Sequence, residues 1–172
     1  TSNSDGDIDR IELIDARRGF RFPLDIPAAD VATLNFPTPA TEASAGSRYM
    51  VLSDVPKTSA WLVDLNEGIA TDLLAIARER EGDDTVALVS ATVSPDDRNV
   101  LLVTDRSVLI IPTDRPAGDR LVGDPTQLSD FHFLNDGDGQ LIYLQTLENG
   151  NSGIVLFDTD TYQPRQIAEV ED

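Results

Sequence analysis

The sequence predicts an all-β chain arranged as a stacked or radial array of small antiparallel sheets. A string of two hydrophobic residues, Asp, three variable residues and Gly recurs in strict or degenerate form along the 172 residues. Short apolar runs and a turn precede each later copy. Residues 46–64 match residues 140–158 without a gap, so that Asp64 falls on Asp158 and Tyr49 on Tyr143. Self-similarity at this period is typical of repeat architectures.

A half unit followed by three full units accounts for the chain. The half unit, 10–26, consists of the run RIELID, the turn ARRG and the run FRFPLDI, after an acidic tail at 1–9. The full units cover about 31–76, 85–122 and 128–170. Their apolar runs are rich in Val, Ile, Leu and Phe and are bounded by Asp, Gly, Pro, Asn and Ser, which predicts strands separated by turns.

Two polar segments are expected to be hairpin turns, and a third segment has two interpretations. SPDDRN (94–99) and NDGDGQ (135–140) carry the Asp, Asn and Gly residues that tight connections need. TDLLAIARERE (71–81) contains good helix formers, which favours a helix. The repeat, however, places an outer strand there. Because tertiary context often overrides propensity, we expect a strand over residues 70–76.

The net charge of −18 restricts the classes of partner. Asp and Glu number 31 against 13 Lys and Arg, and Lys57 is the only lysine. Such a surface repels nucleic acid and anionic membranes. No apolar run approaches the roughly 20 residues of a membrane-spanning helix, so we expect no membrane insertion. Cysteine is absent, which excludes disulfides and thiolate sites.

The lysine-poor, acidic composition has two interpretations. It suits high salt or calcium-rich surroundings, where screening relieves self-repulsion, and this favours an extracytoplasmic location: periplasmic, secreted or on a cell surface. It is equally typical of a GC-rich genome, which favours Arg, Asp and Ala.

The strings SPDDRNVLLVTD with VLIIPTD, and NDGDGQLIYLQT with IVLFDTD, resemble the two halves of a blade in β-propellers of the YVTN, TolB and WD-repeat class. The resemblance covers about residues 10–170 at the level of single blades. It implies a β-propeller-like array of four-stranded antiparallel blades. The Trp-Asp pair of true WD repeats is missing, and the single Trp61 is expected in the core.

About three and a half blades are too few to close a ring, since propellers close with roughly four to eight. Two copies of the chain supply seven blades between them. A longer polypeptide, a different partner chain or an open array are the alternatives, and the sequence starts at Thr1, not Met. An unclosed edge exposes unpaired backbone, and the leading half unit offers such an edge. We therefore expect a protein partner, a second copy or missing sequence.

No catalytic constellation is predicted. His132, the only histidine, lies between Phe131 and Phe133, and strand alternation directs it to the opposite side from both rings. Ser94 and Ser129 lack the motif of an activated nucleophile. We expect a structural role for His132.

The acidic start of the chain is the candidate metal site. Asp5, Asp7 and Asp9 alternate as in calcium loops, although Arg10 and Ala16 replace the Gly and Glu of an EF-hand. A solvated acidic tail explains the same pattern. Calcium is thus the one cofactor that the sequence suggests.

Other acidic residues have structural explanations. Asp136 and Asp138 are accounted for by their turn. Asp64 and Asp158 recur at equivalent strand ends, with Asp15 and Asp114 near such ends, and are expected to cap turns by accepting backbone N–H groups.

These observations predict a non-catalytic interaction or scaffolding segment of a propeller. Two alternatives stay open. One is the propeller part of an enzyme whose catalytic residues lie outside this sequence. The other is a calcium-dependent adhesion module.

Overall fold

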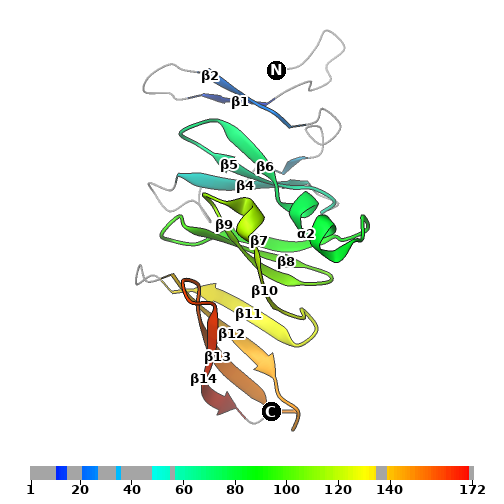
Figure 1. The fold of residues 1–172 in the computed structure, drawn as a ribbon, viewed down its shortest axis with the longest axis vertical. Coiled ribbons are helices and arrows are strands. Elements are labelled where there is room, and N and C mark those ends of the chain that lie inside the picture. The colour runs from blue at the N-terminus through cyan, green and yellow to red at the C-terminus, as the bar shows by residue number, and fades with distance from the viewer. Residues whose placement is uncertain are drawn as a thin grey trace.

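Four antiparallel sheets follow one another along the long axis of the molecule, from β1–β2 at one end to β11–β14 at the other (Figure 1). The computed structural model describes residues 11–14, 21–26, 34–35, 48–54, 57–134 and 139–170. One sheet has two strands and three sheets have four. This is the β-propeller-like array of about three and a half blades that the repeat predicts.

Within each sheet the strands pair in chain order. The leading sheet consists of β1 (Ile11–Ile14) and β2 (Arg21–Leu24). Blade one consists of β3 (Leu34–Asn35), β4 (Tyr49–Asp54), β5 (Ala60–Asp64) and β6 (Ile69–Asp72). Blade two consists of β7 (Leu88–Val93), β8 (Asn99–Thr104), β9 (Val108–Pro112) and β10 (Arg120–Gly123), with the 3-10 turn η1 (Pro116–Gly118) between the last two. Blade three consists of β11 (Leu128–Phe133), β12 (Gln140–Thr146), β13 (Ser152–Asp158) and β14 (Gln163–Val170).

The core lies between successive sheets, not inside any one of them. Successive residues of a strand point to opposite faces, so a sheet with a neighbour on each side buries both faces. In blade two, every residue of β8 and β9 is buried. In blade three, buried and half-buried residues alternate along β13. Blade two is therefore covered on both faces, and blade three on one.

The register shows which residues form each interface. Toward blade one, blade two presents Val100, Leu102, Leu109 and Ile111. Toward blade three, it presents Leu101, Val103, Val108 and Ile110. Blade three contributes Leu141, Tyr143, Val155 and Phe157 to this second interface. The leading sheet packs Leu24 and Ile26 onto Leu52, Trp61 and Val63 of blade one, which confirms Trp61 as a core residue.

The prediction of a strand over residues 70–76 is wrong in its second half. β6 ends at Asp72, and α2 (Leu73–Glu81) follows at once. The carboxylate of Asp72 accepts a hydrogen bond from the N–H of Ala75, and Gly82 ends the helix at a φ of 65°. Both caps stabilise a helix here. Leu73 and Leu74 are buried in the interface between blades one and two, so the helix adds to that core.

The gap-free match of blades one and three is also wrong over part of its length. Asp64 pairs with Tyr49, whereas Asp158 pairs with Gln140. Tyr49 is thus equivalent to Gln140, and not to Tyr143. The central hairpin of blade three is longer, so a match without gaps keeps β5 in register with β13 but shifts β4 against β12.

We expect Leu102→Ala to destabilise the chain strongly. Leu102 is fully buried between blades one and two, and truncating such a leucine costs about 2–5 kcal/mol. The matched variant Leu144→Ala removes the same atoms from a half-buried position of β12 and should cost about 1 kcal/mol or less. Urea unfolding followed by circular dichroism measures both. Equal losses would contradict the assignment of the core to the interfaces between blades.

Candidate functional site

Carboxylates cap equivalent turns in blades one and three. Oδ1 of Asp64 accepts the backbone N–H groups of the residues two and three positions later, at 2.9 and 3.1 Å. Asp158 repeats this arrangement with both distances at 2.9 Å. The predicted capping role of these two residues is confirmed. Each cap fixes the turn that leads into the outermost strand of its blade.

Asp114 does not share this role, so that part of the prediction is wrong. The register places Pro112 of blade two at the position of Asp64 and Asp158. Asp114 is exposed, and its Oδ1 lies 3.8 Å from Nε of Arg115. Asp15 lies outside the described residues.

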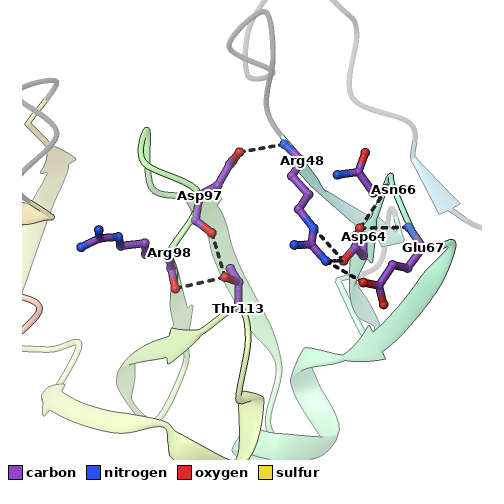
Figure 2. Close-up of polar contacts among 7 residues, drawn as sticks. All are labelled: Arg48, Asp64, Asn66, Glu67, Asp97, Arg98 and Thr113. Atoms are coloured by element: carbon purple, nitrogen blue, oxygen red, sulfur yellow. Dashed lines mark hydrogen bonds and ion pairs between the residues drawn. The ribbon is translucent and has the colours of Figure 1, made fainter.

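Arg48 links the capped turn of blade one to blade two (Figure 2). Its guanidinium donates to Oδ2 of Asp64 from Nε at 3.0 Å and from Nη2 at 2.5 Å. Nη2 also lies 3.0 Å from a carboxylate oxygen of Glu67. The backbone N–H of Arg48 donates to Oδ2 of Asp97 at 2.7 Å, which ties blade one to the first hairpin of blade two.

The charge of Asp64 is stabilised by these contacts. Burial alone raises the pKa of Asp64, but hydrogen bonds from Arg48 and from two backbone N–H groups outweigh burial, so that its pKa lies below the ordinary value. The same hydrogen bond raises the pKa of Arg48. Both side chains therefore stay charged at neutral pH.

Further hydrogen bonds lie at the same end of the array, which we call the loop end. Within blade two, Oγ1 of Thr113 donates to the backbone oxygen of Asp97 at 2.7 Å (Figure 2). Nδ2 of Asn99 donates to Oγ1 of Thr159 at 3.2 Å, and that hydroxyl donates to the backbone oxygen of Gly139. The turns of all three blades are thus held in one polar network.

A cleft of about 990 Å³ opens between these turns. Tyr49 of blade one, Pro112 and Thr113 of blade two and Tyr162 of blade three all line it. Sequence reasoning missed this cleft because its walls are turns far apart along the chain. Recognition sites are common on loops that a rigid frame positions, so the loop end is one candidate site.

The second candidate is the outer face of blade three, the side turned away from blade two. Its four central residues are apolar and only half-buried: Ile142, Leu144, Ile154 and Leu156. Their equivalents in blade two, by strand register, are fully covered by blade three: Leu101, Val103, Val108 and Ile110. Blade three therefore repeats an interface for a neighbouring blade on a face that no described residue covers.

The sequence predicts no catalytic residues, and the structure places His132, Ser94 and Ser129 as follows. His132 is exposed on β11, while Phe131 and Phe133 pack toward blade two, as the alternation predicts. Oγ of Ser94 is buried and accepts the backbone N–H of Asn99 at 2.9 Å. Ser129 is exposed and donates to its neighbour Asp130 at 3.3 Å.

The predicted metal ligands Asp5, Asp7 and Asp9 lie outside the described residues, as do the turn residues Asp136 and Asp138. Among the residues that are described, no three His, Cys, Asp or Glu side chains are grouped so as to hold a metal ion. Within the same ranges, no helix has both the length and the apolarity for a membrane crossing.

Several solved structures are similar to this chain. TolB from Acinetobacter baumannii matches 91% of this chain with 42% of its own, at 15% identity and a TM-score of 0.45. A putative TolB from Agrobacterium tumefaciens matches 99% of this chain with 64% of its own, at 13% identity and a TM-score of 0.46. A chain of a nidogen/laminin complex matches 94% with 59% of its own, at 16% identity and a TM-score of 0.43.

The chain thus spans less than two thirds of each of these three structures. No protein-family model and no curated protein sequence matches it.

We expect Asp64→Asn to lower stability by about 1–2 kcal/mol at pH 7, because the amide cannot pair with the charge of Arg48. A carboxyl whose pKa is lowered by folding stabilises the native state fully above its unfolded pKa, about 3.9. That contribution disappears as the pH falls through the lower folded pKa. The stability gap between wild type and variant should therefore close below about pH 3.9.

Urea unfolding at a series of pH values measures this gap. The exposed Asp114→Asn is the control, because Asp114 caps no turn; its effect should stay within about 0.5 kcal/mol. A gap for Asp64→Asn that stays constant from neutral to acidic pH would contradict the electrostatic role of Asp64.

Proposed function

We propose that this chain is a non-catalytic interaction and scaffolding segment of a propeller, and that it docks a further four-stranded blade on the outer face of blade three. One observation carries the proposal: Ile142, Leu144, Ile154 and Leu156 repeat the residues with which blade two binds blade three, yet they stay half-exposed. Exposed contiguous apolar surface of this kind marks interaction sites.

The chemistry of the occupant is specified by the interface that already exists. Blade three covers blade two with large side chains, including Tyr143 and Phe157, on two neighbouring strands. A docking blade needs the same pattern: large apolar residues at alternate positions of its second and third strands. Sheets of this kind stack about 10 Å apart, at a distance that such side chains fill.

A blade from outside this sequence fits the face better than a second copy does. The other terminal sheet, β1–β2, carries an ion pair of Arg21 and Glu12 at 3.4 Å, in which the side chain of Arg21 is 66% exposed. Burying this guanidinium in a head-to-tail contact carries a desolvation cost. Two copies also repel each other, since each has a net charge of −18.

The acidic, lysine-poor surface also supports an extracytoplasmic location, where higher ionic strength screens this repulsion. That location is part of the proposal.

The proposal predicts that a duplicated blade will dock. In a tandem chain, residues 124–170 are repeated directly after Val170, so that the second copy follows a connection identical to that between β10 and β11. The added Leu141, Tyr143, Val155 and Phe157 should cover the outer face of the original blade three. We expect the Tm of the chain to rise by about 3 °C or more.

The matched control carries the same duplication with Leu144→Glu and Leu156→Glu in the first copy. These two charges on the outer face should abolish the rise in Tm, because burying them unpaired is costly. The proposal fails if the tandem chain and its control have the Tm of the single chain.

Light scattering shows whether a second copy of this chain or a blade from outside this sequence covers the outer face. We expect the single chain to be a monomer near 18.7 kDa at low and at moderate salt, because the −18 charge opposes self-association. A stable dimer that Leu144→Glu and Leu156→Glu dissociate would show instead that a second copy covers the outer face.

The effect of calcium on the Tm distinguishes the proposal from the alternative of a calcium-dependent adhesion module. If residues 1–9 form no metal site, the Tm should be the same with about 5 mM calcium and with EDTA, because only a ligand of the native state raises it. A rise in Tm with calcium that Asp7→Asn abolishes would favour the calcium-dependent module.

A further inference from the structure

The cleft at the loop end gathers positive charge in a strongly acidic protein. Among the described residues, four arginines and three aspartates line the cleft, although Asp and Glu outnumber Lys and Arg by 31 to 13 in the sequence. The cations are Arg48, Arg98, Arg115 and Arg120, and the anions are Asp97, Asp114 and Asp160. The cleft is therefore enriched in arginine relative to the rest of the chain.

Two of these arginines make only long contacts within the protein. Arg98 lies 3.9 Å from Asp96 and 4.0 Å from Asp160, and Figure 2 shows its side chain extending away from Arg48. Arg115 lies 3.8 Å from Asp114. Their side chains are 66% and 82% exposed. These distances exceed those of charge-assisted hydrogen bonds, so both guanidinium groups retain donors for a ligand.

Arg120 is held in place but is not neutralised. Its Nη1 donates to the backbone oxygens of Gly118 at 3.2 Å and Asp119 at 3.0 Å, and its guanidinium lies 5.4 Å from the ring centroid of Tyr162. Carbonyl and aromatic contacts orient a guanidinium without cancelling its charge. Because the group has five N–H donors, some remain available to a ligand.

Arg48 contributes differently from the other three. Asp64 and Glu67 pair with its guanidinium, so Arg48 builds the wall of the cleft and its charge is compensated. The adjacent ring of Tyr49, together with Pro112 and Pro116, adds apolar surface to the lining. The cleft thus combines an apolar wall with three arginines, Arg98, Arg115 and Arg120, whose contacts with carboxylates are long or absent among the described residues.

We propose that this cleft binds an acidic peptide segment of another protein, whose carboxylates pair with Arg98, Arg115 and Arg120. A guanidinium matches the geometry of a carboxylate bidentately. The cleft volume of about 990 Å³ lies at the upper end of the range for ligand sites, and its walls come from three blades, so it accommodates an extended segment of several residues.

The observations favour a peptide over a nucleic acid. A phosphate backbone carries one charge per nucleotide, and outside the cleft it meets a protein with a net charge of −18. A short acidic segment places its charges inside the cleft alone. The apolar lining also suits aliphatic parts of a peptide. This site is separate from the outer face of blade three and does not depend on what docks there.

Fluorescence anisotropy with labelled hexaglutamate tests the proposal, with labelled hexaglutamine as the uncharged probe. We expect hexaglutamate to bind at low ionic strength and to dissociate as added salt screens the contacts. Hexaglutamine should not bind. The double variant Arg98→Gln with Arg115→Gln should weaken hexaglutamate binding by about tenfold or more, because each lost charge-assisted contact is substantial.

The double variant Arg106→Gln with Arg165→Gln is the matched control. Both residues are exposed and neither lines the cleft, so the same charge is removed elsewhere. Its affinity for hexaglutamate should change less than about twofold. The Tm of each double variant shows that it is folded.

Three results would overturn the proposal: no binding of hexaglutamate to the wild-type chain at millimolar concentration, equal weakening in both double variants, or equally tight binding of a thymidine hexanucleotide. Amide chemical shifts of the wild-type chain give an independent readout. They should move in residues 113–120 and at Tyr162 when hexaglutamate is added, and shifts spread evenly over the surface would equally contradict a site in the cleft.

Discussion

Apolar packing between successive sheets is the interaction on which the rest of the structure depends. A four-stranded sheet of short strands encloses no core of its own, so each blade must bury its faces against neighbours. Blade two does this completely, and the fully buried β8 and β9 are the centre of the molecule. The helix α2 adds Leu73 and Leu74 to the interface between blades one and two. Within the described residues, blade three packs against a neighbouring blade on one side only.

The polar network at the loop end depends on this packing and adds to it. Only after the blades are stacked does the N–H of Arg48 reach Asp97, or Asn99 reach Thr159. These bonds fix the relative positions of the turns, and thereby of the walls of the cleft. The arginines of the cleft are thus held by turns whose positions are fixed by the apolar interfaces between the blades.

Much of the fold could be predicted from the sequence, because short apolar runs between Asp- and Gly-rich turns specify strands almost independently of context. The repeat favours a strand where α2 lies, although the signals of the helix are local, since Asp72 and Gly82 are typical helix ends. The two candidate sites could not be predicted from the sequence, for a different reason. The sequence pattern around Leu144 and Leu156 is that of core residues in any sheet. Only the structure shows that no described blade covers these two side chains. The cleft requires turns from three blades to meet, which no local pattern encodes.

Hydrogen exchange in the central strands tests most directly whether coverage by neighbouring blades, and not pairing within a sheet, stabilises the array. β8–β9 and β12–β13 are both central pairs with complete strand partners, but the first pair is covered on both faces and the second on one. We expect the amides of β12–β13 to exchange much faster than those of β8–β9 in the single chain, through local opening of blade three. In the tandem chain, whose added blade covers the outer face, the two pairs should be protected alike. Equal protection in the single chain would show that each blade is stable without its neighbour, and the outer face of blade three would then need no partner.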